Sequence, residues 1–150
     1  MNKYILANQI LSESSRHSTL FHASPVQNLK ELKANNKTMN QLAGRGIYAT
    51  DDMTYASAFC FEWSDADGIR LGRINNGPWT IELPSKYKAT LKKKPCSIYT
   101  ISSKYFNDMT TQLKTPEWVS STYNIPVMRE YKYKSVLEAF EKNKLKVKWL

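Results

Sequence analysis

The stretch 44–61, GRGIYATDDMTYASAFCF, constrains the fold of this chain more than any other part of it. Its residue types predict three elements in succession. A tight turn over 44–46 has glycine on both sides of an arginine, so its backbone can take a positive φ or lie close against a ligand. A short strand follows over 47–50, and apolar residues at helical spacing predict a helix over 51–61.

Two acidic residues and one aromatic ring in this stretch are typical of a segment that lines a ligand pocket. Asp51 and Asp52 stand where a helix needs an N-cap and acids in its first turn. A glycine turn, a strand and a capped helix are a common way to present a ring, here Tyr48, to a small-molecule pocket. Arg45 could bind a phosphate through two hydrogen bonds, or it could be an ordinary surface turn residue. Which interpretation holds depends on residues elsewhere in the chain.

The remaining sequence predicts mainly strands. Thr19–Ser24 is a strand that Pro25 stops, and two β-like runs around an Asn-Gly pair predict a hairpin. We expect helices over 2–12 and 135–142, strands over 69–74, 79–83, 96–101, 117–120, 125–131 and 145–149, loops over 34–42 and 108–116, and a strand edge or loop over 86–94. The fold class is therefore α+β, with a mostly antiparallel sheet that could be split into two packed sheets.

Length and composition indicate a folded chain of one domain, residues 1–150. Hydrophobic residues make up 41% of it, and no apolar run approaches the length that spans a bilayer. The N-terminus lacks the cleavage site of a signal peptide. Cys60 and Cys96 are too far apart in sequence for a zinc motif, so we expect reduced thiols and a cytoplasmic protein. Delivery into a host cell without a cleaved signal is the alternative.

The charge of +9 is unevenly distributed. Residues 1–75 carry 8 Lys and Arg against 7 Asp and Glu, whereas residues 76–150 carry 14 against 6. The basic second half predicts attraction to an anionic partner such as nucleic acid, a phosphorylated ligand or an acidic protein. A lysine-rich surface that only keeps the protein in solution is the competing interpretation.

Two residues are candidates for chemistry, each with an ordinary alternative. His22 lies within a strand, where it could bind a ligand or be a core histidine bonded to a carbonyl. Glu117 begins the strand EWVS beside a tryptophan, a place where its proton affinity can be tuned, although a solvated glutamate at a strand end is commoner. Glu130 is a rival carboxylate. The histidines have no acidic or cysteine partners at ligand spacing, so no metal is expected.

Taken together, FHAS around His22, GRGIYAT around Tyr48 and EWVS at Glu117 resemble the ADP-ribosyltransferase fold. They are similar to its His–Tyr–Glu branch, which includes diphtheria-toxin-like and poly-ADP-ribose-polymerase-like enzymes and small bacterial or phage proteins. The resemblance implies split antiparallel sheets with short flanking helices. It implies catalytic roles for His22, Tyr48 and Glu117. It also implies NAD contacts from His22, Ala23, Ser24, Arg45, Gly46, Tyr48, Tyr55 and Phe59.

The same resemblance implies an activity. NAD would be the substrate, no metal would be needed, and ADP-ribose would pass to a macromolecular acceptor that is either protein or nucleic acid. His22 would bond the riboses, Tyr48 would stack on the nicotinamide with Tyr55 as a second wall, and Glu117 would bond a ribose 2′-hydroxyl. Two alternatives remain at this point: an NAD hydrolase or RNA 2′-phosphotransferase on the same fold, and a basic, non-catalytic binder. A toxin or phage-conflict setting is expected from the resemblance alone.

Overall fold

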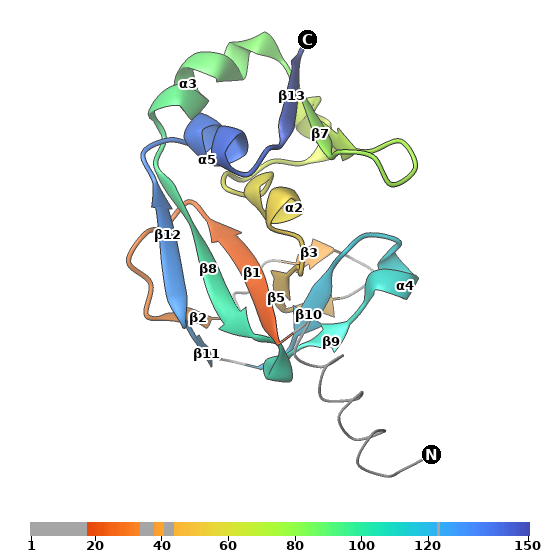
Figure 1. Ribbon diagram of the computed structural model, residues 1–150, viewed down its shortest axis with the longest axis vertical. Helices are drawn as coiled ribbons and strands as arrows, with labels where there is room; N and C mark the ends of the chain where they lie inside the picture. Colours follow the sequence, from red (N-terminus) through yellow and green to blue (C-terminus); the bar gives the residue numbers. More distant parts are fainter. Residues whose placement is uncertain (1–17, 34–37, 41–43, 123) are drawn as a thin grey trace, which may run out of the picture.

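The computed structural model describes residues 18–33, 38–40, 44–122 and 124–150. Within these residues the chain is α+β, built mostly from small antiparallel sheets with a few short helices (Figure 1). The helix expected over 2–12 lies outside the described residues. No helix among the described residues is both long enough and apolar enough to cross a membrane.

Most elements are short. The strands are β1 (Thr19–Ser24), β2 (Glu31–Lys33), β3 (Thr38–Asn40), β4 (Gly44–Arg45), β5 (Ile47–Ala49), β6 (Arg70–Gly72), β7 (Thr80–Leu83), β8 (Cys96–Ser102), β9 (Asn107–Asp108), β10 (Trp118–Ser120), β11 (Asn124–Pro126), β12 (Arg129–Tyr133) and β13 (Lys146–Trp149). The α-helices are α2 (Met53–Ser57), α3 (Lys88–Lys93), α4 (Thr110–Leu113) and α5 (Val136–Lys142), and the 3-10 helices are η1 (Asp65–Asp67), η2 (Ser85–Tyr87) and η3 (Ser103–Tyr105).

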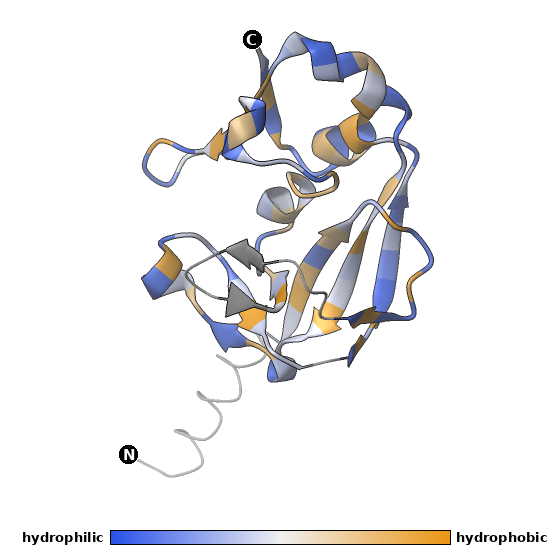
Figure 2. Ribbon diagram, turned by 180° about the vertical axis from the view of Figure 1, so that it is seen from behind, coloured by the Kyte–Doolittle hydropathy of each residue, from blue (hydrophilic) through white to orange (hydrophobic). Residues whose placement is uncertain are grey.

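The central sheet has the order β1-β8-β12 and is antiparallel throughout. Its middle strand β8 is buried from Cys96 to Ile101, as expected for a strand covered on both faces. The edge strand β12, REYKY, is largely hydrophilic (Figure 2), which discourages pairing with another chain. Pro25 ends β1 as the sequence predicts, because the ring disfavours continued pairing.

A second sheet, β5-β10-β9, meets the central sheet beside β1. The meeting point is a pair of backbone hydrogen bonds, from Phe21 N to Thr50 O at 2.7 Å and from Thr50 N to Phe21 O at 3.0 Å. β10 lies between β5 and β9, with Val119 opposite Tyr48. This junction brings β1, β5 and β10 together although they are far apart in sequence.

The helices and the remaining strands build the other half of the molecule. α2 and α5 pack together with β7 and β13 around one hydrophobic cluster, while the lower ends of β1 and β8 and strands β2, β5 and β11 enclose a second (Figure 1). Phe140 of α5 and Ile81 of β7 are fully buried in the first cluster, and Leu20 and Ile125 in the second. β13 is an edge strand, as predicted, and it runs parallel to β7.

The predicted helix over 51–61 is shorter than expected. Its N-cap is Asp52, whose Oδ1 accepts a hydrogen bond from the Tyr55 amide at 3.1 Å, and Asp51 lies outside the helix. After Ser57 the amides bond three residues back instead of four, as in Phe59 N to Ala56 O at 2.9 Å. This tightening ends the α-helix but keeps the chain turning towards Trp63.

Four other expectations are wrong in part. Segment 86–94 contains helix α3, because Leu91 anchors one side of the lysine-rich run. Segment 125–131 is divided between β11 and β12, which belong to different sheets. Within 108–116, α4 replaces part of the predicted loop. The described part of 34–42 is strand β3, which pairs with β4.

The predicted tight turn at 44–46 is also different, because residues 44–45 form β4. Gly46 then connects β4 to β5. A Cβ on Gly46 would lie 2.7 Å from the Ser120 carbonyl oxygen and 3.0 Å from a Val119 methyl group. Glycine is therefore required here for close approach to the backbone of β10, and not for a positive φ.

We predict that Gly46→Ala destabilises the protein by about 1–3 kcal/mol, because the added methyl group pushes β5 away from a backbone atom of β10. Gly72→Ala is the matched control, since no atom lies within 4 Å of a Cβ placed there. Chemical denaturation of the wild type and both variants measures the difference. Equal stability of the two variants would contradict the proposed clash.

Candidate active site

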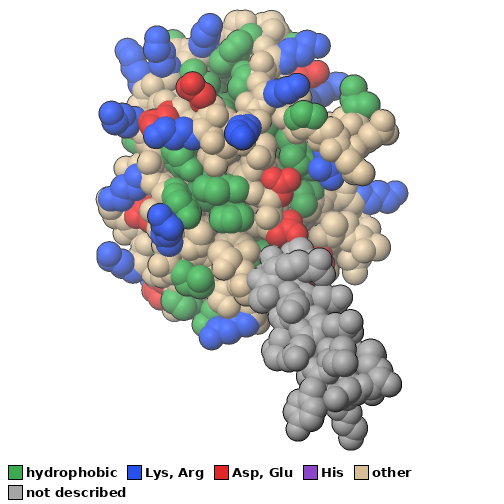
Figure 3. Space-filling model, viewed as in Figure 1, with side chains coloured by type: hydrophobic (Ala, Val, Ile, Leu, Met, Phe, Trp, Pro, Cys, Tyr) green, Lys and Arg blue, Asp and Glu red, His purple; other side chains and the backbone are tan. Residues whose placement is uncertain are grey.

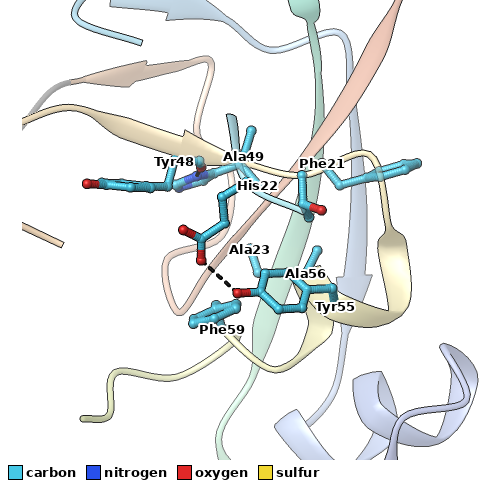
Figure 4. Close-up of a pocket in the computed structure, with 10 residues that line it drawn as sticks. Phe21, His22, Ala23, Tyr48, Ala49, Tyr55, Ala56 and Phe59 are labelled. Atoms are coloured by element: carbon cyan, nitrogen blue, oxygen red, sulfur yellow. Dashed lines mark hydrogen bonds between the residues drawn. The ribbon is translucent and has the colours of Figure 1, made fainter. Parts of the chain in front are cut away.

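A pocket lies at the junction of the two sheets and α2. It holds ≈ 540 Å³ of empty space, including the part open to solvent. Its lining comprises Phe21, His22, Ala23, Tyr48, Ala49, Thr50, Tyr55, Ala56, Phe59 and Glu117 (Figure 4). Side chains from β1, β5 and α2 and from the residue before β10 therefore face one space.

His22 is fixed by the neighbouring sheet. Its Nδ1 lies 2.6 Å from the Tyr48 carbonyl oxygen. Because a carbonyl only accepts, Nδ1 carries the proton and donates. Burial lowers the pKa of His22 below its ordinary value of 6.5, although this hydrogen bond opposes part of the shift. A neutral imidazole with Nδ1 protonated keeps Nε2 as a hydrogen-bond acceptor at neutral pH.

Glu117 is held by a tyrosine from α2. The Tyr55 hydroxyl donates a hydrogen bond of 2.7 Å to Glu117 Oε1 (Figure 4). Burial and the adjacent charge of Glu117 raise the pKa of Tyr55 far above its ordinary value, so the phenol remains protonated and available as a donor. The Glu117 carbonyl also accepts a bond from the Met109 amide at 3.0 Å, which fixes the backbone beside the carboxylate.

A set of aromatic contacts supports Tyr55. The ring of Trp79 lies 4.8 Å from that of Tyr55 in an edge arrangement, and Phe59 lies 5.2 Å away on the next turn of the chain. The Trp79 indole N–H donates to Asp52 Oδ2 at 2.9 Å. Asp52 thus caps α2 with one carboxylate oxygen and positions Trp79 with the other, so the ring of Tyr55 has little freedom to move.

Tyr48 reaches the pocket because of strand pairing. β5 is buried along its whole length, and it pairs with β10 so that Trp118 lies opposite Ala49 and Val119 opposite Tyr48. Glu117, the residue before β10, consequently lies next to the end of β5. The register of β10 against β5 therefore places the carboxylate of Glu117 in the same pocket as Tyr48.

The rival carboxylate lies elsewhere. Glu130 is opposite Tyr99 in the central sheet and does not line the pocket. Its Oε2 accepts hydrogen bonds from the Ser97 hydroxyl at 2.6 Å and the Asn28 amide at 2.9 Å. Partial burial favours a higher pKa, but these hydrogen bonds outweigh it and hold the pKa of Glu130 below its ordinary value. Glu130 ties β12 to the segment after β1.

Two of the predicted ligand contacts do not line the pocket. Ser24 is buried at the end of β1, where its hydroxyl accepts a bond from the Val26 amide at 3.0 Å. Gly46 packs against β10, as described above. The side chain of Arg45 lies outside the described residues. Ala23, Tyr55 and Phe59 do line the pocket.

Sequence reasoning missed four lining residues and one supporting pair. The lining residues are Phe21, Ala49, Thr50 and Ala56. Phe21 and Thr50 are the two residues that bond across the sheet junction, and their neighbours in sequence are His22 and Ala49. The supporting pair is Asp52 and Trp79. Asp52 was expected to cap the helix, but no signal in the sequence connects it to Trp79.

The electrostatic character of the pocket suits a cation. Three aromatic rings, of Tyr48, Tyr55 and Phe59, present π-faces or edges beside one carboxylate, while His22 is neutral. Among the described residues, no group of three or more His, Cys, Asp or Glu side chains could hold a metal ion. The two cysteines are buried and free, and a hydrogen bond to Cys96 together with burial raises the pKa of Cys60.

We predict that the stability of the protein falls as the pH drops below about 6.5, because His22 binds a proton more readily in the unfolded than in the folded chain. This contribution is complete above the unfolded pKa and declines towards the lower folded pKa. His22→Asn can keep a donor to the Tyr48 carbonyl but cannot titrate. The variant should lose less stability than the wild type in urea denaturation between pH 7 and pH 5; parallel losses would contradict the assignment.

We predict that Tyr55→Phe lowers the free energy of unfolding by about 1–2 kcal/mol, because a partly buried carboxylate oxygen loses its donor while the ring contacts remain. Tyr131→Phe serves as the control, since its hydroxyl has no hydrogen bond within the described part of the chain. Denaturation at pH 7 compares the two. A loss for Tyr131→Phe as large as that for Tyr55→Phe would contradict a specific role of the bond to Glu117.

Comparisons of the chain with models of protein families, with curated proteins and with solved structures found no match. The resemblance of three short motifs to the His–Tyr–Glu enzymes therefore has no support from overall similarity. The geometry of the pocket is the observation on which a functional proposal has to rest.

Proposed function

We propose that the protein is an NAD-dependent ADP-ribosyltransferase that modifies a macromolecular target. The observation that carries the proposal is the convergence of His22, Tyr48 and Glu117 in one pocket. These residues come from three segments that are far apart in the sequence, and all three line the same cavity. Chance placement of all three around one small cavity is an unfavourable explanation.

The nicotinamide end of NAD fits the chemistry of this pocket. Its ring is positively charged while it is bonded to ribose, and aromatic faces attract such a charge. Tyr48 provides a ring from β5, and Tyr55 and Phe59 provide rings from the α2 side. The Nε2 atom of neutral His22 can accept a hydrogen bond from a ribose hydroxyl. The single carboxylate can accept another.

The reaction breaks the bond between the nicotinamide nitrogen and C1′ of the ribose, and the electron pair leaves with the nicotinamide. C1′ becomes electron-deficient, a lone pair of the acceptor forms the new bond to it, and the acceptor loses a proton. Glu117 stabilises the positive charge that develops on the ribose. Because the carboxylate is held by Tyr55 before the substrate arrives, little reorganisation is required at the moment of reaction.

The other contacts of the pocket hold these three residues in position. His22 and Tyr48 are joined by the hydrogen bond to the Tyr48 carbonyl. The His22 Nε2 atom, which would accept a hydrogen bond from the ribose, and the Tyr48 ring, which would stack on the nicotinamide, therefore keep a constant separation. Tyr55 acts through Glu117 by orienting its carboxylate, and Trp79 and Asp52 act through Tyr55. Each of these supports lies on an element of secondary structure or at its end, which favours a rigid site.

We predict that Glu117→Gln lowers kcat/KM for release of nicotinamide from NAD by about 10²–10³, the usual loss for one preorganised electrostatic group. Glu130→Gln is the matched control, because it makes the same chemical change outside the pocket. The measurement is nicotinamide release and ADP-ribose transfer with labelled NAD, with circular dichroism to show that both variants are folded. Free ADP-ribose without a modified acceptor would assign water as the acceptor.

Two results would contradict the proposal. One is the absence of both nicotinamide release and NAD binding in the wild type. The other is a Glu117→Gln variant that is as active as the wild type, whether or not the Glu130→Gln variant keeps its activity. Calorimetry with NAD separates loss of binding from loss of the chemical step.

A further inference from the structure

Lysines are concentrated on one part of the molecule. Segments 85–94 and 142–150 contain nine lysines and no acidic residue: Lys86, Lys88, Lys92, Lys93, Lys94, Lys142, Lys144, Lys146 and Lys148. The fold brings the two segments together. The Ser85 hydroxyl donates to the Leu150 carbonyl at 2.6 Å, and Lys88 Nζ lies 5.6 Å from the centre of the Trp149 ring. Figure 3 shows Lys and Arg side chains spread over the top of the molecule, where Figure 1 places α3 and β13.

Most of this charge is not neutralised within the described residues. Lys142 pairs with Glu138 at 2.9 Å, and Lys148 lies 4.0 Å from Glu82. The other seven lysines of the two segments form no salt bridge with a described residue. Like charges held together without partners repel one another, so an anion that binds across them relieves an unfavourable potential.

A groove extends this charge towards the pocket. It is formed by residues of the β13-β7-β6 sheet and of the turn between β6 and β7. Its cations are Arg70, Arg73 and Lys146, and Glu82 is the one acid among its described lining residues. The groove holds ≈ 1060 Å³ of empty space, including the part open to solvent. Arg70, Arg73 and the nine lysines together form the basic surface of the protein.

Trp79 connects the groove to the candidate active site, although it is not among the lining residues of either. The Arg73 guanidinium carbon lies 4.3 Å from the centre of the Trp79 ring, and the same ring contacts Tyr55 of the pocket. The Lys146 amide donates to the Trp79 carbonyl at 3.2 Å. Arg73 of the groove, Trp79 and Tyr55 of the pocket therefore form a continuous series of contacts.

From these contacts we infer that the basic surface binds the phosphate backbone of a nucleic acid and presents that nucleic acid to the pocket as the acceptor. The second half of this inference rests on the proposed function. Lys146 and Lys148 are exposed on one face of β13, with Val147 and Trp149 on the other. Alternate residues of a strand are about 6.6 Å apart, close to the separation of successive phosphates in an extended single strand.

Nucleic acid accounts for these features better than a membrane does. A peripheral membrane surface combines basic residues with a continuous apolar patch. The exposed large apolar side chains nearby, Ile74 and Leu150, are single residues on a hairpin tip and at the last strand. In contrast, aromatic rings lie beside the cations, as Lys86 at Tyr87 and Lys88 at Trp149. Rings among lysines are typical of surfaces that bind single strands.

The test measures binding without NAD, so that it does not depend on catalysis. Fluorescence anisotropy is recorded for the full chain with a labelled 30-nucleotide single-stranded DNA, the RNA of the same sequence and a DNA duplex. The triple variant Arg70→Gln, Arg73→Gln and Lys146→Gln removes the cations of the groove. The control Lys30→Gln, Lys33→Gln and Lys104→Gln removes the same charge near β2 and after β8, at the opposite end of the molecule (Figure 1).

We expect the groove variant to bind single strands at least tenfold more weakly than the wild type, and the control to change by less than twofold. The slope of log K against log salt should become shallower by about 2, since each lost phosphate contact contributes about 0.7. Equal losses in both variants, no binding by the wild type at low salt, or tighter binding to phosphatidylserine vesicles than to any nucleic acid would overturn the inference.

A second measurement separates the inference from the proposed function. The wild type is incubated with labelled NAD and either nucleic acid or a protein mixture. Label on the nucleic acid supports the acceptor assignment, whereas label on protein alone overturns it and leaves the transferase intact. Groove-dependent binding without nicotinamide release would remove the proposed function while leaving the basic surface as a nucleic-acid site.

Discussion

The site depends on the two backbone hydrogen bonds between Phe21 and Thr50, which join the central sheet to the β5-β10-β9 sheet. His22 follows Phe21, and Ala49 precedes Thr50, so the bonded pair fixes the distance between the histidine and the strand that carries Tyr48. The Nδ1–carbonyl bond from His22 to Tyr48 extends the same junction by one side chain. If these bonds were lost, the pocket would separate into two faces, each with only part of the proposed machinery.

The charge of the protein is divided according to the two proposed substrates, NAD and a nucleic-acid acceptor. The pocket places rings and a carboxylate around a neutral histidine, which suits a cationic group. Outside it, Arg70, Arg73 and the lysines create a positive potential that attracts phosphates. The pocket would therefore attract the cationic ring of NAD, and the basic surface would attract the phosphates of the proposed nucleic-acid acceptor. A pocket and a surface of the same sign would not separate the two.

Sequence reasoning located what local chemistry determines. Pro25 marks the end of β1, an Asn-Gly pair marks the β6–β7 hairpin, and Ser135 caps α5 through the Glu138 amide at 3.1 Å. It failed where a distant contact decides. Helix α3 was hidden because lysines surround Leu91, its one buried residue.

The same distinction applies within the site. The residue types of His22, Tyr48 and Glu117 could be chosen from short motifs, whereas the choice between Glu117 and Glu130 could not. The register of the sheets places the two carboxylates apart: Glu117 precedes a strand that pairs with β5, and Glu130 lies in a strand that pairs with β8. Long-range strand pairing has no signature in one sequence, because each strand shows only which of its faces is apolar.

Trp79 connects the two regions physically. Its ring touches Tyr55 on one side and the Arg73 guanidinium on another, and its N–H is held by the N-cap of α2. A phosphate that draws Arg73 away from the ring would change the support of Tyr55, and Tyr55 holds Glu117. An acceptor in the groove could therefore alter the position of the carboxylate through two ring contacts and one hydrogen bond. Any such coupling acts in both directions, because a coupling free energy between two binding sites is the same for both.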